Sequence, residues 1–214
     1  MVEPTDFDSG ASGRGQIWLI RHGETQWSRI GKHTGRTDLP LTPAGEQAAT
    51  ALHATITGHT FGLVMVSPLV RAERTATLAG ATSSAMGEVV TDPDLMEWDY
   101  GAWEGRTTAE IRQTLRRADW TIWNDVIPAG RTPGEQPAEV AARCERVLAS
   151  VRVVLNRGED ALLVAHGHLL RILTATWLGL PATDGRLWAL APATISRLGF
   201  EHEQPVIRGW NCPT

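Results

Sequence analysis

Residues 16–25 read QIWLIRHGET, a short apolar run that ends in an arginine, a histidine and a glycine. Two later stretches also place a polar turn directly after a short apolar run, GLVMVSP at 62–68 and ALLVAHG at 161–167. Unbroken apolar runs of this length are typical of strands buried on both faces, as in parallel sheets. Three such strands are predicted, at 16–20, 62–66 and 161–165.

Helix-start signals separate these strands. Ser or Thr before Pro favours a helix amino terminus, because the hydroxyl accepts a free backbone N–H and Pro fits the first turn. Such pairs stand at 42–43 and 67–68, and Thr107 with Glu110 has capping-box spacing. The expected helices are 43–57, 68–79, 107–117 and 137–157, and further strands are expected at 88–90, 193–200 and 205–209. This alternation predicts an α/β fold, a three-layer sandwich in which a mostly parallel central sheet has helices on both faces.

Length and composition limit the domain organisation. The 214 residues suit one domain. We expect a flexible N-terminal tail at 1–15, a single domain at 16–214 and, within it, a cap or lid segment at 98–136. The net charge of −4 at pH 7 does not favour nucleic-acid binding. No apolar run reaches the roughly 18 residues that cross a membrane.

Cysteine usage and the N-terminus bear on the compartment. Cys144 and Cys212 are the only cysteines, too few for a disulfide framework. Residues 1–15 lack the apolar segment of a secretory signal. These features predict a cytoplasmic protein. The terminal strands and the Trp-rich surface are candidates for contacts within a homodimer.

Charged residues gather at the predicted strand ends. Ligands of an open parallel sheet bind beyond the carboxyl ends of its strands. Arg21, His22, His166 and Gly167 fall at such ends, and Arg71 lies in the first turn of the helix after the second strand. Arginines bind phosphate oxygens through paired N–H groups, and helix amino termini offer unpaired amides to anions. The pattern predicts a crevice for a small dianion that carries a phosphoryl group.

The stretch LIRHGET at 19–25 resembles the signature of the histidine phosphatase superfamily, which includes cofactor-dependent phosphoglycerate mutases. The resemblance extends along residues 16–200. It is carried by TG at 34–35, LPLTPAG at 39–45, SPLVRAERTA at 67–76, Glu97 and HG at 166–167. One RHGE is a moderate signal, but the ordered set at these spacings is strong. It implies a phosphoglycerate mutase-like fold.

The resemblance also implies roles for the crevice residues. His22 would be the nucleophile and would pass through a phosphohistidine intermediate. Arg21, Arg71 and His166 would bind the transferring phosphoryl group, and Glu97 would protonate the leaving oxygen and then activate water. The further candidates for substrate binding are Ser28, Thr34, Gly35, Tyr100 and Gly167. No metal and no cofactor is implied, and because an ordinary glutamate titrates near about 4.3, an acidic pH optimum is expected.

Ser28 is a departure from the family pattern, which often has Asn at this position. Serine donates one hydrogen bond where asparagine offers two donors. Ser28 is therefore a weaker candidate for phosphate binding than Thr34.

The segment between Glu97 and His166 favours a phosphatase over a mutase. It spans 69 positions, which is compact for the family, and residues 120–124 carry no basic residue for a substrate carboxylate. EWDYGAWEG at 97–105, with WTIWND at 120–125, resembles acid and sugar phosphatases, including sedoheptulose bisphosphatase-like enzymes. We expect a metal-independent phosphatase of small phosphate monoesters, sugar phosphates among them. Cofactor-dependent phosphoglycerate mutase is the alternative.

Some of these residues also have possible structural roles. His166 and His168 have the spacing of a metal-binding pair, but the third ligand would be His22 beside Arg21, where a cation would be repelled. His168 is expected to be structural and His33 to be a surface or packing residue. A binding module without turnover is disfavoured, because it has no need of five intact catalytic positions.

Two further structural alternatives remain open. Arg71 has Glu46 and Glu73 as alternative partners for an ion pair. The tryptophans of the Trp-rich stretch are expected in the core more than on a ligand surface: Trp98, Trp103, Trp120 and Trp123.

Overall fold

The computed structural model describes residues 13–213, and its centre is one six-stranded sheet in the order β3-β2-β4-β1-β5-β6. The strands are β1 (Ile17–Arg21), β2 (Leu63–Val66), β3 (Glu88–Thr91), β4 (Ala161–Ala165), β5 (Ile195–Glu201) and β6 (Gln204–Cys212). β1 to β4 pair in parallel, whereas β5 is antiparallel to β1 and to β6. Each strand lies within a few residues of its predicted place, and Glu201 pairs with Gln204 across the expected hairpin.

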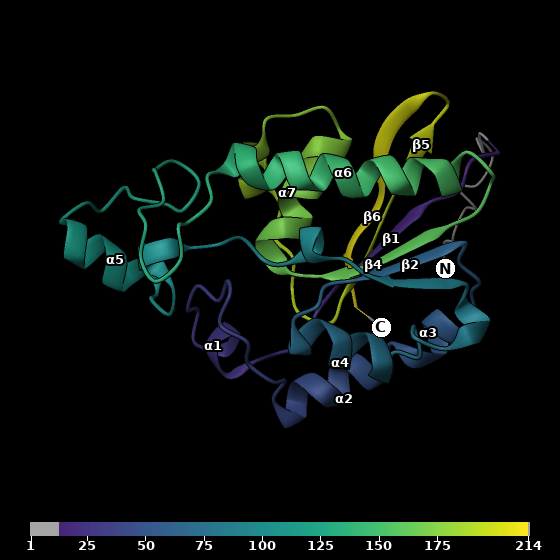
Figure 1. The fold of residues 1–214 in the computed structure, drawn as a ribbon, viewed down its shortest axis with the longest axis horizontal. Helices are drawn as coiled ribbons and strands as arrows, with labels where there is room; N and C mark the ends of the chain where they lie inside the picture. The colour runs from purple at the N-terminus through teal and green to yellow at the C-terminus, as the bar shows by residue number, and fades with distance from the viewer. Residues whose placement is uncertain (1–12, 214) are drawn as a thin grey trace, which may run out of the picture.

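Helices cover both faces of this sheet (Figure 1). α6 (Pro137–Leu155) and α7 (Gly167–Trp177) lie on one face, and α2 (Pro43–Ala51), α3 (His53–Thr57) and α4 (Val70–Leu78) lie on the other. Side chains of a strand alternate between faces. Ile17 and Leu19 therefore enter the core under α6 and α7, while Trp18 and Ile20 enter the core beside α2 to α4. The predicted three-layer sandwich is confirmed.

Two predicted helix starts are confirmed. Thr42 caps α2 by accepting the N–H of Gly45 at 3.0 Å. Thr107 and Glu110 form the capping box of α5 (Thr108–Leu115). The single helix expected over 43–57 is broken at Leu52 into α2 and α3.

The helix start predicted at 67–68 is wrong, because α4 begins at Val70. The Ser67 hydroxyl lies 2.7 Å from His166 Nε2. The N–H of Val70 instead donates to Asp38 Oδ1 at 3.0 Å. A distant carboxylate thus replaces the local cap, which no sequence spacing reveals.

Several short elements were not predicted. They are α1 (Gln26–Arg29) and the 3-10 helices η1 (Ser84–Met86), η2 (Pro93–Leu95), η3 (Gly101–Trp103) and η4 (Ala182–Leu187). α1 follows β1 directly, and Thr25 and Ser28 form its capping box.

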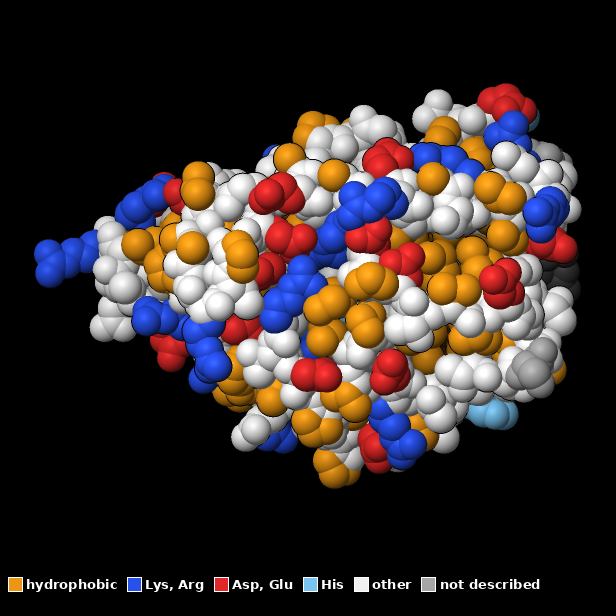
Figure 2. Space-filling view, viewed as in Figure 1, with side chains coloured by type: hydrophobic (Ala, Val, Ile, Leu, Met, Phe, Trp, Pro, Cys, Tyr) orange, Lys and Arg blue, Asp and Glu red, His pale blue; other side chains and the backbone are white. Residues whose placement is uncertain are grey.

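Segment 98–136 carries η3 and α5 and projects from one end of the sandwich (Figure 1). Basic side chains surround α5 on the surface (Figure 2), and Arg116 and Arg117 are exposed there. Arg143 of α6 holds the end of the segment through two bonds to Glu135, at 2.9 and 3.0 Å. All four tryptophans of the segment are buried, which confirms their expected place in the core: Trp98, Trp103, Trp120 and Trp123. Opening and closing of this segment as a lid stays a prediction.

Most of the expected N-terminal tail, residues 1–12, lies outside the described residues. Next to it, the N–H of Gly15 donates to the Leu155 carbonyl at 3.0 Å. Cys144 is buried in the core and Cys212 is exposed, and both are free thiols. Within residues 13–213, no helix combines the length and apolarity needed to cross a membrane.

Candidate active site

The ends of β1 and β4 bring two histidines together. Arg21 pairs with Ala165 across the parallel strands, and the N–H of His22 continues the ladder by donating to the Ala165 carbonyl at 2.9 Å. His166 follows Ala165 directly as the N-cap of α7. The rings of His22 and His166 therefore lie 5.1 Å apart between centroids. This is the predicted meeting of strand ends at the carboxyl edge of the sheet.

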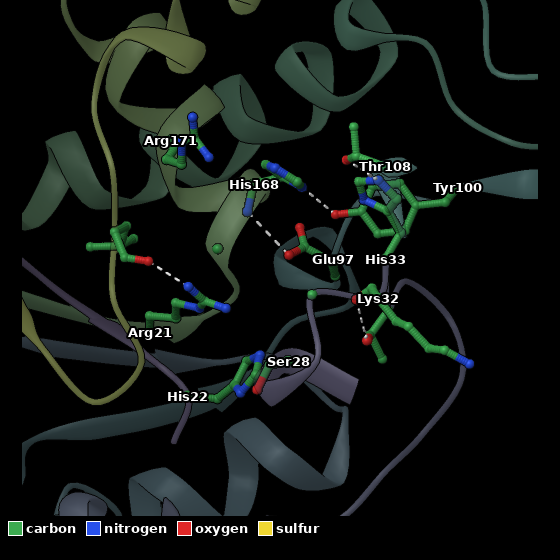
Figure 3. Close-up of a pocket in the computed structure, with 14 residues that line it drawn as sticks. Arg21, His22, Ser28, Lys32, His33, Glu97, Tyr100, Thr108, His168 and Arg171 are labelled. Atoms are coloured by element: carbon green, nitrogen blue, oxygen red, sulfur yellow. Dashed lines mark hydrogen bonds between the residues drawn. The ribbon is translucent and has the colours of Figure 1, made fainter. Parts of the chain in front are cut away.

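A cavity of about 270 Å³ opens at this edge. Figure 3 shows Glu97 near its centre, with Arg21 and His22 on one side and Tyr100 and His33 on the other. The residues that line it are Arg21, His22, Ser28, Gly31, Lys32, His33, Thr34, Glu97, Tyr100, Thr108, Gly167, His168, Arg171 and Leu190.

His22 is held as a neutral imidazole. Burial lowers its pKa well below the usual value, and the positive charges of Arg71 and Arg21 lower the pKa further. Its Nδ1 lies 2.7 Å from the Gly23 carbonyl. A carbonyl only accepts, so Nδ1 carries the proton and Nε2 keeps its lone pair. The nitrogen with the lone pair is the one that can attack phosphorus.

Arg21 supplies the positive charge next to this nucleophile. Its Nη1 donates to the Leu190 carbonyl, and its Nε is buried with no partner among the described residues. A Cβ on Gly167 would lie 3.2 Å from Arg21 Cζ. The glycine therefore leaves room for the guanidinium to lie across the start of α7. Burial lowers the pKa of Arg21, but an arginine remains charged at neutral pH.

Arg71 and His166 lie close to His22 but do not line the cavity. Both are fully buried. The Nε of Arg71 donates to His166 Nδ1 at 3.2 Å, so that His166 Nε2 carries the proton that faces Ser67. The terminal nitrogens of Arg71 donate to the carbonyls of Thr34, Gly35 and Thr37 at 2.9 to 3.2 Å. Direct contact of these two side chains with a phosphoryl group stays a prediction.

Glu97 projects into the cavity and is fixed by backbone amides. Oε1 accepts the N–H groups of Trp98 and Leu169 at 2.9 and 2.8 Å, and Oε2 accepts the N–H of His168 at 3.1 Å. Two of these donors belong to the first turn of α7. Oε2 has one protein partner and is the oxygen with capacity left for a proton.

These contacts correct only part of the expectation that helix amino termini offer free amides to the ligand. At α7, Glu97 accepts the N–H groups of His168 and Leu169. At α4, Asp38 accepts the N–H of Val70. The N–H of Gly167, which lines the cavity at the start of α7, has no acceptor among the described residues and stays available to an anion.

Tyr100, a predicted substrate-binding residue, lines the cavity, and sequence reasoning missed the two histidines that lie beside it there, His33 and His168. The Tyr100 hydroxyl lies 2.5 Å from His168 Nδ1, and the His33 ring lies 5.0 Å from the Tyr100 ring. Burial raises the pKa of Tyr100 and lowers that of His168, so the phenol donates and the imidazole accepts. Burial lowers the pKa of His33 to about 4. His33 packs on Tyr100, which agrees with the packing role expected of it, and it also lines the cavity, which was not predicted.

Three predicted binding residues have their polar groups engaged elsewhere. The Ser28 hydroxyl donates to the Thr25 carbonyl at 3.1 Å, within the capping box of α1. The Thr34 hydroxyl donates to the Lys32 carbonyl at 3.1 Å. Ser28 and Thr34 line the cavity, but Gly35 does not.

Gly35 instead packs behind the cavity. Its N–H donates to Glu104 and its carbonyl accepts from Arg71. A Cβ at this position would lie 2.4 Å from the Trp98 carbonyl oxygen, so only glycine fits.

The structural alternatives can also be compared with the geometry. Glu46 pairs with Arg74 at 2.7 Å, not with Arg71. His166 faces Ser67 and His168 faces Tyr100, so the two histidines do not converge. Over the described part of the chain, no three His, Cys, Asp or Glu side chains are grouped as metal ligands.

Comparisons with known proteins agree with the resemblance seen in the sequence. A model of the histidine phosphatase superfamily (branch 1) matches residues 17–213. The chain is 36% identical over 194 residues to the acid phosphatase of Mycobacterium tuberculosis, across 87% of each protein. It is 34% identical over 185 residues to sedoheptulose 1,7-bisphosphatase of Saccharomyces cerevisiae, covering 76% of this chain and 67% of the relative.

A mutase-named relative and a solved structure complete the comparison. The chain is 32% identical over 200 residues to "Probable phosphoglycerate mutase GpmB" of Photorhabdus laumondii, covering 93% of this chain and 91% of that protein. The solved structure of the open reading frame Rv3214 from Mycobacterium tuberculosis matches with a TM-score of 0.83 and 33% identity, over 93% of this chain and 98% of that chain. Both matches span nearly the whole domain.

Proposed function

The chain belongs to the histidine phosphatase superfamily (branch 1), and on that premise we propose that it hydrolyses small phosphate monoesters through a phosphohistidine at His22. The observation that carries the proposal is the contact of His22 Nδ1 with the Gly23 carbonyl oxygen, at 2.7 Å. The Nδ1 proton is donated to the Gly23 carbonyl, and burial together with the positive charges of Arg71 and Arg21 lowers the pKa of the ring and keeps it neutral. A neutral imidazole with Nε2 unprotonated is the form that acts as a nucleophile.

The reaction then takes two steps. In the first, His22 Nε2 forms a bond to phosphorus, the bond from phosphorus to the ester oxygen breaks, and Glu97 gives its proton to that oxygen. In the second, a water gives a proton to Glu97 and attacks phosphorus, and the P–N bond breaks to release inorganic phosphate. Arg21 neutralises charge on the phosphoryl oxygens during both steps. Arg71 adds a second positive charge near His22, and the neutral ring of His166 packs beside the His22 ring.

Phosphatase-named relatives support the substrate class. The acid phosphatase and the sugar bisphosphatase act on phosphate esters by name, and we propose small phosphate esters, sugar phosphates among them, for this chain. The mutase-named relative favours a second candidate, phosphoglycerate mutase. The reaction itself uses no metal and no cofactor. Free thiols at Cys144 and Cys212 agree with a cytoplasmic location.

Phosphorus NMR separates the two candidates. The protein is incubated with 3-phosphoglycerate and a trace of 2,3-bisphosphoglycerate without added metal, and in parallel with p-nitrophenyl phosphate. Growth of inorganic phosphate supports the phosphatase. Growth of 2-phosphoglycerate at constant total ester makes the protein a mutase.

His22→Ala tests the intermediate. Turnover and the base-stable phosphorylated enzyme should both vanish while the fold persists. His53→Ala is the matched control, because His53 is exposed on α3 away from the cavity. Substantial turnover by His22→Ala would refute the phosphohistidine mechanism.

A further inference from the structure

Arg171 lies on the cavity wall without an acidic partner. It stands on α7 one turn beyond His168, and Figure 3 shows it on the same side of the cavity as Arg21. Its Nε donates to the Gly185 carbonyl at 2.8 Å, and its Cζ lies 4.7 Å from the centre of the Trp123 ring. Within residues 13–213, no carboxylate lies within ion-pair distance of it, and its two terminal nitrogens have no acceptor.

Among the partly or wholly buried arginines of residues 13–213, three have no carboxylate partner, and two of these, Arg21 and Arg171, line the cavity. Arg36 and Arg143, which are also partly or wholly buried, both pair with Glu135, at 3.3 and 2.9 Å. A buried charge is costly unless a partner compensates it. Burial accordingly lowers the pKa of Arg171, and its positive charge helps to lower the pKa of His168. The missing partner points to a ligand.

Of the charged side chains on the cavity wall, Arg171 is one that the transferred phosphoryl group does not need. Arg21, Lys32 and Arg171 are the cations of the wall and Glu97 is its carboxylate, while the depressed pKa values keep the histidines neutral. Arg21 stands beside His22 and serves the reacting group. Lys32 packs over Trp27 at 5.5 Å, and Figure 3 shows its amino group directed away from the centre. Arg171 is the remaining cation that faces the cavity.

We propose that Arg171 determines specificity by binding a second acidic group of the substrate, a carboxylate or a second phosphate, while Arg21 and His22 hold the phosphoryl group that is transferred. This inference rests on the proposed phosphatase function. Gly167 marks the position of the Arg21 guanidinium on α7, and Arg171 follows it by four residues, about 6 Å along the helix axis. A short carbon chain spans that separation. The Trp123 ring and the Gly185 carbonyl hold the planar guanidinium so that its terminal N–H groups are presented as a pair, which suits an oxyanion.

A purely structural role for Arg171 gives a different experimental result. Arg171 links α7 to η4 through Gly185 and to segment 98–136 through Trp123. Loss of that link would impair hydrolysis of every substrate by a similar factor. Loss of a binding residue instead lowers the preference for substrates that carry the second acidic group.

The test compares kcat/KM for matched substrates. 3-Phosphoglycerate and glycerol 3-phosphate differ by a carboxylate against a hydroxymethyl group. Butane-1,4-diol bisphosphate and its monophosphate differ by the second phosphate. We expect the wild-type protein to prefer the more acidic member of at least one pair, and that pair identifies the acidic group. Arg171→Gln should lower this preference roughly 10- to 100-fold, the effect of a lost charge-assisted hydrogen bond.

Two variants control the result. Arg171→Lys keeps the charge but not the paired geometry, and should give an intermediate preference with the fold retained. Arg186→Gln removes an exposed arginine of η4 that bonds to Asp184, and should leave the preference unchanged. An equal loss on both members of a pair in both Arg171 variants, or no preference in the wild-type protein, overturns the inference. If the wild-type protein hydrolyses neither these esters nor p-nitrophenyl phosphate, the proposed function itself has failed.

Discussion

Replacing Glu97 with Gln tests the proposed acid and its anchoring in one variant. A glutamine with its oxygen at the Oε1 position keeps the bonds from Trp98 and Leu169, but its NH2 group then faces the N–H of His168, donor against donor. One buried donor loses its acceptor, which costs about 1–3 kcal/mol. For a domain of this size, each kcal/mol lowers Tm by roughly 2–4 °C. Thermal unfolding should therefore show a modest loss of stability and an intact fold.

The effect of Glu97→Gln on activity should depend on the leaving group. An alkoxide needs a proton to leave, and loss of a general acid typically costs roughly 10²- to 10⁴-fold. p-Nitrophenolate leaves without a proton, so kcat/KM for p-nitrophenyl phosphate should fall much less than kcat/KM for glycerol 3-phosphate. The comparison uses kcat/KM because this parameter measures transition-state stabilisation relative to free enzyme and substrate. Phosphate release measures both.

Glu104→Gln is the matched control for this variant. Glu104 also accepts backbone N–H groups, from Gly35 and Thr37 at 2.9 to 3.1 Å, but it does not line the cavity. The Glu104→Gln variant should lose stability, but its kcat/KM values for the two substrates should change by the same factor. An equal loss on both substrates in Glu97→Gln would show that Glu97 does not protonate the leaving oxygen.

Two further predictions concern stability. Acidification from pH 7 to pH 5 should destabilise the fold, because burial lowers the pKa values of His22, His33 and His166, and the unfolded chain binds protons below about 6.5 that the folded chain does not. His33, with its pKa of about 4, accounts for about 2 kcal/mol of that loss, and an unfolding midpoint in urea that is the same at both pH values would contradict the reasoning. Arg143→Met leaves Glu135 without its two-bond partner and should lower the free energy of unfolding by about 3–5 kcal/mol. Urea unfolding of this variant checks the value, and a loss below about 1 kcal/mol would show that Arg36 alone neutralises Glu135.

The strands and long helices were predictable because their signals are local. The apolar run at 161–165 matches β4 residue for residue, and Thr42 caps α2 as its spacing indicates. The start of α4 was not predictable, because Ser67 turns to His166 and Asp38 supplies the acceptor from another part of the chain. Prediction of a helix start from local sequence fails where the capping side chain bonds to a distant residue instead.

In the candidate site, too, some residues were predictable from local sequence and others were not. Arg21 ends β1 and His22 follows it, so the strand pattern alone places them at the sheet edge. His33 and Arg171 reach the cavity only after chain segments far apart in sequence pack together. Arg171 lies next to Trp123 by tertiary packing, not by sequence spacing. A signal for it did exist, since it stands three residues after His168 and therefore on the same face of α7.

The start of α7 determines how this site treats an anion. In many phosphate sites the helix amides bind the ligand directly, but here the amides of His168 and Leu169 hold Glu97. As a result, successive positions of α7 have different roles in the site. Its first amides fix the proposed acid, Gly167 leaves space for the Arg21 guanidinium, and Arg171 extends the positive surface one turn further. Because Arg21 and Arg171 both line this cavity, the proposed specificity follows from the same helix that fixes the proposed acid.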